Sequence, residues 1–164
     1  MKILNRSNLL QAMAGLCLLV GGPTVAGETE PRLEMTVIRD SAQGETIIRG
    51  RYESALERLE EDGRRDRFAR RNNLCVAHAR AGDLVAAQAA CDAAIDLARE
   101  KAIGVPPHVV RLHQRHEALA LTNRGVLAAM QGRNDAARED FAAAIALSQD
   151  LSAPEHNLAL VGAR

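Results

Sequence analysis

The sequence predicts an all-α protein built from about three antiparallel helical hairpins, and its composition and a repeated turn are the observations that predict it. Alanine, the strongest helix former, dominates the composition. Aromatic residues make up only 2% of the 164 residues and Trp is absent, whereas β-sandwiches and barrels are normally rich in aromatic and β-branched residues. The length suits one domain with a modest core.

The first 26 residues are predicted to form a signal peptide. Lys2 and Arg6 give a basic start, an apolar stretch follows over residues 9–20, and small residues lead up to a cleavage site after Ala26. The apolar stretch has about 12 residues, whereas a membrane-spanning helix needs about 20. We therefore expect no stable membrane span, and we predict a periplasmic or secreted protein. The alternative is an uncleaved signal that anchors the chain in the inner membrane.

Residues 27–40 show no clear period and are predicted to form an irregular leader. After them, three six-residue stretches, 50–55, 82–87 and 132–137, each begin with Gly and end with Ala. Glycine can take the left-handed conformation that ends a helix, and alanine lets two helices approach closely. A helical domain is therefore predicted over residues 41–164, with a hairpin turn at each of the three glycines.

Polar residues close to two of these glycines are expected to cap the helices that follow. Asp83 comes directly after Gly82, and Asn134 lies two residues after Gly132. Either side chain can accept a hydrogen bond from a free backbone N–H in the first turn of a helix.

The three stretches resemble the turn of the tetratricopeptide repeat, a 34-residue helix-turn-helix unit. Residues 73–78 and 123–128, upstream of the second and third turns, each begin with Asn, where the family often has Asn-Leu-Gly. Asn157 follows Asn123 by 34 residues, which is the family period. The resemblance covers about residues 42–164 and implies a short α-solenoid of stacked hairpins.

The chain departs from the family pattern between the second and third repeats. Asn73 and Asn123 are 50 residues apart instead of 34, and Pro107 marks the break. Proline suits the first turn of a helix, and apolar residues recur at helical spacing after it. One long helix is therefore predicted over about residues 107–131.

The resemblance also implies a binding surface. In tetratricopeptide proteins the first helices of successive hairpins line a concave groove, where asparagines at the positions matched here by Asn73, Asn123 and Asn157 often contact an extended peptide. A side-chain amide offers a donor and an acceptor, which match the C=O and N–H of a peptide unit. Arg80 and Arg124 are further candidates, because arginine can hold a carboxylate with two hydrogen bonds. The alternative is that the asparagines only join neighbouring helices.

Cys75 and Cys91 lie eight residues either side of Asp83, within the second turn. Residues equidistant from the turn of an antiparallel hairpin face each other, so we predict a disulfide, as suits an oxidising compartment. Chain entropy would give it about 3 kcal/mol. Two alternatives stay open: buried free thiols that pack as small apolar groups, and a Cys75–His78 dyad, for which no third, orienting group is visible.

Histidines and arginines form two further clusters. His108, His113 and His116 make a metal site conceivable, but no His-Glu-x-x-His pattern is present, so partly exposed helix residues are favoured and neither metal nor cofactor is expected. The arginine-rich run 64–71 follows the acidic residues of 57–62 and predicts a solvated, ion-paired helix face. Contact with anionic lipid or an acidic partner is the alternative there.

The balanced charge and the absence of common catalytic motifs exclude several classes of function. Lys+Arg and Asp+Glu each number 21, so no nucleic-acid partner is expected. The sequence has no Gly-x-Ser-x-Gly elbow, Walker A loop or Gly-x-Gly-x-x-Gly motif, so no enzyme is expected. The leading hypothesis is an exported, non-catalytic adaptor that binds a protein or peptide partner through the groove. The alternative is a structural subunit that self-associates into a homo-oligomer or envelope complex, and a histidine-cluster metal-binding protein is a minor one.

Overall fold

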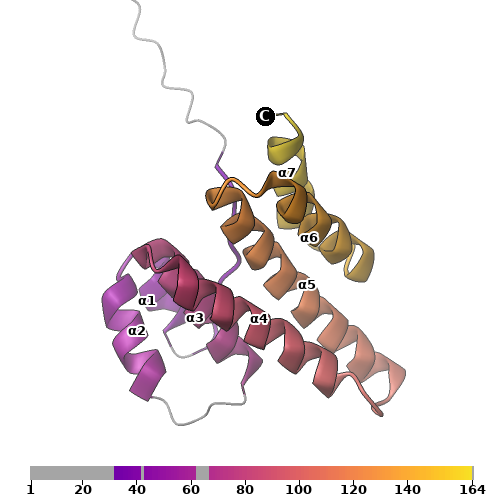
Figure 1. Ribbon diagram of the computed structural model, residues 1–164. Helices are drawn as coiled ribbons and strands as arrows, with labels where there is room; N and C mark the ends of the chain where they lie inside the picture. Colours follow the sequence, from indigo (N-terminus) through magenta and orange to yellow (C-terminus); the bar gives the residue numbers. More distant parts are fainter. Residues whose placement is uncertain (1–31, 42, 62–66, 164) are drawn as a thin grey trace, which may run out of the picture. The chain divides into compact units, whose positions relative to one another are not determined.

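The described part of the chain, residues 32–41, 43–61 and 67–163 of a computed structural model, contains seven helices. Figure 1 shows them as α1 (Gly44–Ile48), α2 (Tyr52–Glu61), α3 (Phe68–Ala81), α4 (Leu84–Lys101), α5 (Pro107–Met130), α6 (Asn134–Leu147) and α7 (Ser152–Gly162). No strand occurs in these ranges, so the all-α prediction is confirmed. None of the described helices has the length and apolarity needed to cross a membrane. The predicted signal peptide, and Arg64 and Arg65 of the basic run, lie outside the described residues.

Three short turns join α1 to α2, α3 to α4 and α5 to α6. The predicted glycine in each turn has the positive φ that residues with a side chain rarely adopt: 74° at Gly50, 90° at Gly82 and 75° at Gly132. The alanine five residues after each glycine is 0% exposed: Ala55, Ala87 and Ala137. The predicted turns and the close approach of helices at these alanines are therefore confirmed.

One of the two expected helix caps is present. The Asp83 carboxylate accepts a hydrogen bond from the Ala86 N–H at 3.0 Å. The prediction for Asn134 is wrong, because α6 begins at that residue and Arg133 occupies the capping position without a side-chain hydrogen bond. Arg133 follows its glycine directly, as Asp83 does, but an arginine side chain has no acceptor to offer.

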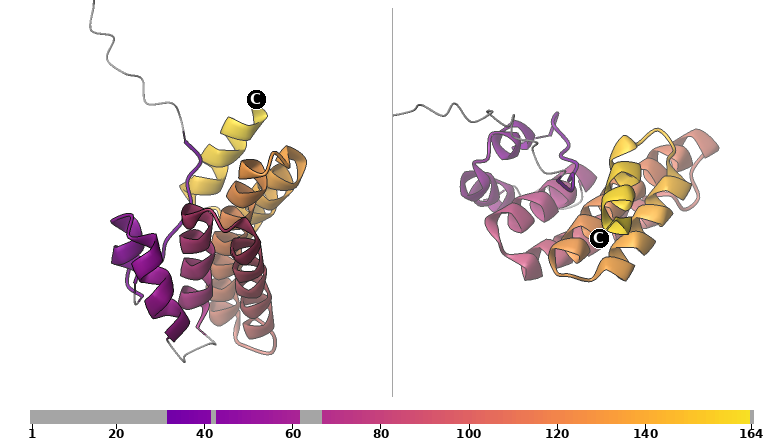
Figure 2. Two further views of the ribbon diagram at one scale, coloured as in Figure 1. Left: turned by 60° about the vertical axis from the view of Figure 1, so that its left-hand side comes forward. Right: turned by 90° about the horizontal axis from the view of Figure 1, so that it is seen from above.

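The long helix predicted over residues 107–131 is α5, which spans Pro107–Met130. Its first residue is Pro107, where the missing N–H would have had no helical partner. Helix α3 packs against α1 and α5, and α5 packs against α7, while α4 packs on both α3 and α5 (Figure 2). The odd-numbered helices therefore form a row, and α3, α5 and α7 of this row carry the three asparagines predicted to bind a peptide.

Helices α5 and α6 approach closely where Gly125 faces Phe141. The Phe141 side chain is 0% exposed, and a Cβ atom at position 125 would lie only 2.5 Å from its Cε1 atom. Protein interiors pack as densely as organic crystals, so the ring has no empty space into which it could withdraw. Only glycine therefore fits at position 125, because any side chain there would overlap the Phe141 ring.

Substituting Gly125→Ala is expected to lower the free energy of unfolding by about 2 kcal/mol. Overpacking a core typically costs about 1–3 kcal/mol, and a contact as short as 2.5 Å belongs at the upper end of that range. The gain of about 1 kcal/mol from alanine in a helix offsets part of it. Urea denaturation measures the effect. Gly162→Ala in α7 is the matched control, because no atom lies within 4 Å of its added Cβ. Equal stability of Gly125→Ala and wild type would show that Phe141 can move.

The two cysteines lie at disulfide distance between α3 and α4, as the sequence predicted. The Cα atoms of Cys75 and Cys91 are 5.0 Å apart and the two sulfur atoms are bonded. Both residues are buried. The free-thiol and Cys75–His78 alternatives each need an unbonded Cys75 sulfur, which this disulfide removes.

Candidate peptide-binding groove

Residues 32–38 form an extended segment that lies across the row of odd-numbered helices. The segment meets α7 first, then α5 and finally α3, and it appears in indigo in Figures 1 and 2. The sequence predicted an irregular leader over 27–40, and the described residues of that range include this segment. The segment belongs to no helix or strand, and its main chain is instead bonded by side chains of the helices.

Every second residue of the segment is held by one asparagine through two hydrogen bonds. In each pair the asparagine Oδ1 accepts the backbone N–H, and the Nδ2 donates to the C=O of the same residue. The distances, N–H bond first, are 2.8 and 2.8 Å for Glu34–Asn157, 2.7 and 2.9 Å for Thr36–Asn123, and 2.9 and 3.0 Å for Ile38–Asn73. The three asparagines are therefore brought together as a regular ladder along one extended peptide.

The three asparagines of this ladder are 0% exposed. A buried amide that lacks partners is costly, because its donor and acceptor lose their bonds to water. Here the segment supplies a donor and an acceptor to each amide. Most of the contacts are thus with the chain's own main chain, and one, from Asn123 to Asn72, joins neighbouring helices as the alternative from the sequence expected.

Asn72, which sequence reasoning missed, is a fourth member of the ladder. Its Nδ2 donates to the Thr36 C=O at 3.0 Å, and its Oδ1 accepts from Asn123 Nδ2 at 2.9 Å. It is also 0% exposed. The adjacent pair Asn72–Asn73 in an alanine-rich helix was the available signal, because asparagine is rarely buried without partners.

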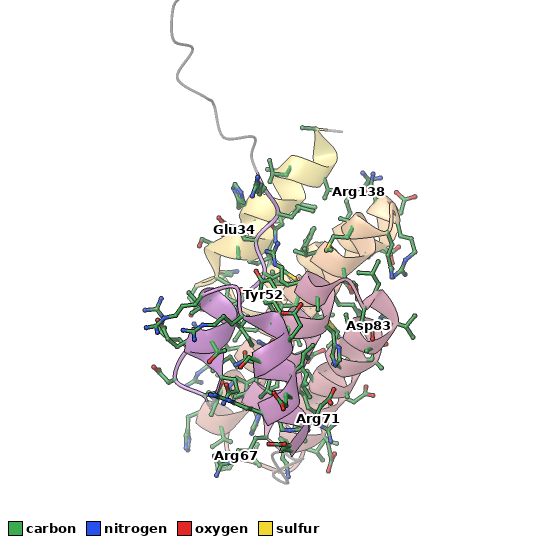
Figure 3. All side chains as sticks on the ribbon, turned by 90° about the vertical axis from the view of Figure 1, so that its left-hand side faces the viewer. Glu34, Tyr52, Arg67, Arg71, Asp83 and Arg138 are labelled. Atoms are coloured by element: carbon green, nitrogen blue, oxygen red, sulfur yellow. A yellow bond between two sulfur atoms is a disulfide. The ribbon has the colours of Figure 1, made fainter. Side chains whose placement is uncertain are left out.

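The apolar side chains of the segment pack toward the core. Leu33, Met35 and Val37 pack against clusters of buried residues. Glu34 is exposed, and Figure 3 shows it beside α7. Ile38, at the end of the segment, packs against a further cluster. The segment therefore uses its odd-numbered side chains and that of Ile38 for apolar contacts, and its even-numbered main-chain groups for the asparagine ladder.

The opposite main-chain edge of the segment is open. Within the described ranges, no hydrogen bond reaches the N–H or C=O groups of Leu33, Met35 and Val37. Consecutive residues of an extended chain present these groups to opposite edges, so the edge that faces away from the asparagines has no partner.

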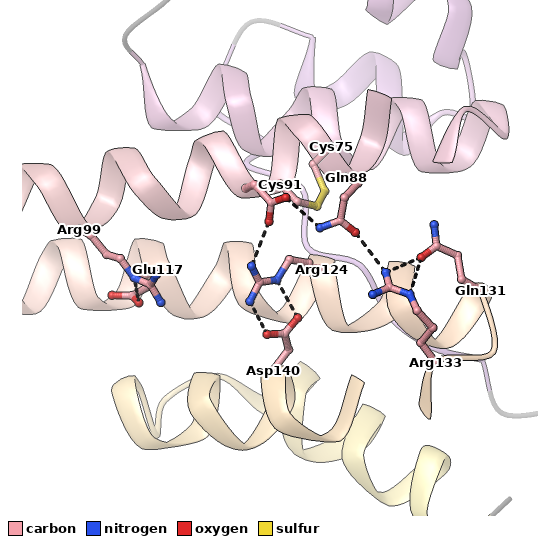
Figure 4. A network of polar contacts seen from close by, with 10 residues as sticks. Cys75, Gln88, Cys91, Arg99, Glu117, Arg124, Gln131, Arg133 and Asp140 are labelled. Atoms are coloured by element: carbon pink, nitrogen blue, oxygen red, sulfur yellow. Dashed lines mark hydrogen bonds and ion pairs between the residues drawn. A yellow bond between two sulfur atoms is a disulfide. The ribbon is translucent and has the colours of Figure 1, made fainter. Parts of the chain in front are cut away.

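Arg124, a predicted ligand-binding residue, is held by two carboxylates of neighbouring helices (Figure 4). Its Nε and Nη2 bind Asp140 at 2.8 and 2.7 Å, and its Nη1 binds Asp92 at 2.9 Å. The hydrogen bonds to Asp140, and then the one to Asp92, raise the pKa of Arg124 despite its partial burial. These bonds join α5 to α6 and α4, so the guanidinium is used within the fold.

Arg80, the other predicted arginine, is exposed at the α3 end of the groove. It lines a cavity of about 210 Å³ together with Met35 and Val37 of the segment and Ile47, Ile48, Tyr52 and Val76. Tyr52 is labelled in Figure 3. Arg80 therefore lies beside the extended segment with its side chain accessible from solvent.

Two residues of the histidine cluster, His113 and His116, pack as aromatic side chains, whereas His108 is exposed. The His116 ring stacks on Phe68 with centroids 4.3 Å apart, and His113 meets His116 edge-on at 5.8 Å. Across the described ranges, no group of three His, Cys, Asp or Glu side chains is placed to hold a metal ion. Burial, followed by the charges of His113 and Arg115, lowers the pKa of His116.

Stability is therefore expected to fall on acidification. Because folding lowers the His116 pKa, the unfolded chain takes up a proton at a higher pH than the folded chain does. The stabilisation that comes from keeping His116 neutral is complete above the ordinary histidine pKa of 6.5. It is lost as the pH falls below that value, and the loss stops once the pH is below the pKa of His116 in the folded protein. Tm values at about pH 7.5 and 5.5 measure it. His116→Phe keeps a stacked ring and should reduce the dependence, and an unchanged dependence would assign it to other groups.

Comparisons with protein-family models, with curated proteins and with solved structures find no match to this chain. The three asparagines were selected by sequence, and the structure places all of them on one extended main chain. Their geometry is therefore the basis for a functional proposal.

Proposed function

We propose that this protein is an exported, non-catalytic adaptor whose hairpins stack like tetratricopeptide repeats and whose groove holds an extended segment of a partner protein. The observation that carries the proposal is the asparagine ladder, in which each amide pairs with both main-chain groups of every second residue. Main-chain contacts do not depend on side-chain identity, so the same ladder can hold other sequences.

The position of the ladder in the fold supports the proposal. Asn73, Asn123 and Asn157 come from three successive odd-numbered helices, and each is completely buried. Helices that only needed to pack on one another would be served by apolar residues at these positions. The predicted signal peptide and the disulfide are both in keeping with export to an oxidising compartment.

A photo-crosslinking amino acid at position 80 tests the proposal in cells that make the protein. Arg80 is exposed and borders the same cavity as Met35 and Val37, so a partner segment in the groove would lie within reach. Asp96, exposed on α4, is the control position. We expect one partner to be crosslinked at 80 and not at 96, with mass spectrometry locating the link in a single segment.

The outcomes of this experiment separate the two leading hypotheses. Crosslinks of equal yield at both positions, or at neither, would count against binding at the groove. Crosslinks from position 80 only to a second copy of this chain would favour the self-associating structural subunit.

A further inference from the structure

We propose that residues 33–38 are a built-in ligand of the groove, and that the partner segment which replaces them is internal to its chain, extended and apolar at every second residue. This inference rests on the proposed function and specifies its ligand. Three features of the segment carry it: its main-chain bonds, the places of its side chains, and its short connection to α1.

The main-chain bonds define the conformation that the groove accepts. Glu34, Thr36 and Ile38 each make two bonds of 2.7–3.0 Å to one asparagine. A step of two residues is the repeat of an extended chain, in which alternate residues present their polar groups to the same edge. A helical or tightly turned ligand could not reach all three asparagines in this way.

The side chains define the sequence pattern. Met35, at the centre, packs against three separate clusters of buried residues. Leu33 packs against the cluster of Val126 and Val161, and Val37 against the cluster of Ile47 and Val76. Ile38, the sixth residue, packs against the cluster of Phe68 and Leu119, whereas Glu34 is exposed. The groove therefore selects apolar residues at the first, third, fifth and sixth positions of the ligand and tolerates a charge at the second.

The groove is built for the interior of a chain and not for its end. Asn73 binds the C=O of an Ile38 peptide group, and the main chain continues from there to α1. Arg124, which could have held a terminal carboxylate, is already bonded to Asp140 and Asp92. A ligand with a blocked C-terminus should therefore bind as well as one with a free carboxylate.

The short connection to α1 makes the built-in ligand a strong competitor. The segment ends at Ile38 and α1 begins at Gly44, and a tether of this length gives an effective concentration on the order of millimolar. A free peptide at micromolar concentration is then excluded, because its apparent affinity falls with the fraction of open grooves. Weakening the segment should open the groove.

The test uses the full mature chain and a fluorescent peptide of residues 32–40 with both ends blocked. Thr36→Pro removes the N–H that Asn123 accepts and introduces a ring at the centre of the ladder. Thr36→Val, the matched control, keeps this N–H and a β-branched side chain. Fluorescence anisotropy should show the peptide binding at least about 10-fold more tightly to Thr36→Pro than to Thr36→Val or wild type.

Circular dichroism first establishes that Thr36→Pro keeps its helices. If it unfolds, Leu33→Ser/Val37→Ser weakens the segment through its side chains and takes its place in the titration. Equal binding by all variants would overturn the inference and would point to docking on the open edge of residues 33, 35 and 37. A helical variant that binds no peptide would also overturn it.

These failures are distinguishable from a failure of the proposed function. Photo-crosslinking at position 80 uses the wild-type segment and can succeed when the peptide titration fails. Conversely, if peptide binding to Thr36→Pro is unchanged by a further Asn123→Ala, the peptide binds elsewhere and the groove itself is wrongly assigned.

Discussion

Asn123→Ala is expected to lower the free energy of unfolding by about 4 kcal/mol, the largest effect of any single substitution considered for this protein. The substitution removes three hydrogen bonds, two with Thr36 and one with Asn72. It leaves the Thr36 N–H and the Asn72 Oδ1 without those partners, and each unsatisfied buried group costs about 1–3 kcal/mol. Asn123 is 0% exposed, so water cannot replace the lost bonds without opening the groove.

Urea denaturation and hydrogen exchange measure this effect together. The Thr36 amide should exchange much faster in Asn123→Ala, because the centre of the ladder is lost. Asn134→Ala is the matched control: it makes the same chemical change at a partly exposed residue with no side-chain capping bond. If both substitutions had the same small effect, the segment would not be held by the ladder in solution.

Replacing both cysteines by alanine is expected to cost about 3 kcal/mol. The disulfide closes a loop with a sequence separation of 16 and so restricts the unfolded chain. Cys75 and Cys91 are 1% and 0% exposed, and alanine in their place also leaves a small cavity. The bond joins α3, which carries Asn72 and Asn73, to α4, so its loss should loosen the α3 end of the groove.

Wild-type protein unfolded in urea with and without a reductant gives an independent measure of the same bond. The reductant should shift the midpoint of wild type and leave Cys75→Ala/Cys91→Ala unchanged. A midpoint that does not respond to reductant in wild type would mean that the disulfide adds nothing to stability.

Local sequence signals predicted much of the fold because their physical causes are local. A glycine such as Gly82 marks a turn through its own backbone freedom. The boundary of α5 at Pro107 likewise follows from proline's fixed φ and missing N–H. The start of α6 was predicted to within one residue, because the capping position is Arg133 and not Asn134. That one-residue difference removes the capping hydrogen bond, because the arginine side chain has no acceptor.

The groove could be predicted only in part. The resemblance to tetratricopeptide repeats pointed to the three asparagines. Their partners are main-chain groups, which are the same in every residue and so cannot be recognised in a sequence. These contacts join residues 35, 87 and 123 positions apart. Besides the adjacent pair Asn72–Asn73, the alternation of Leu33, Met35 and Val37 was an available hint, since period-two apolar spacing indicates an extended chain. The partners of Arg124 were hidden for a related reason, because Asp92 and Asp140 come from two other helices.

The order of the ladder has a consequence for how the chain acquires its structure. Residues 33–38 are synthesised before all of the described helices, yet Glu34 pairs with Asn157, 123 positions later, in α7. During synthesis this segment therefore lacks its hydrogen-bond partner on α7 until that helix has been made. Such long-range contacts slow folding, and exposed extended segments are where nascent chains misassemble or recruit chaperones. The ladder can therefore be completed only after α7 has been made.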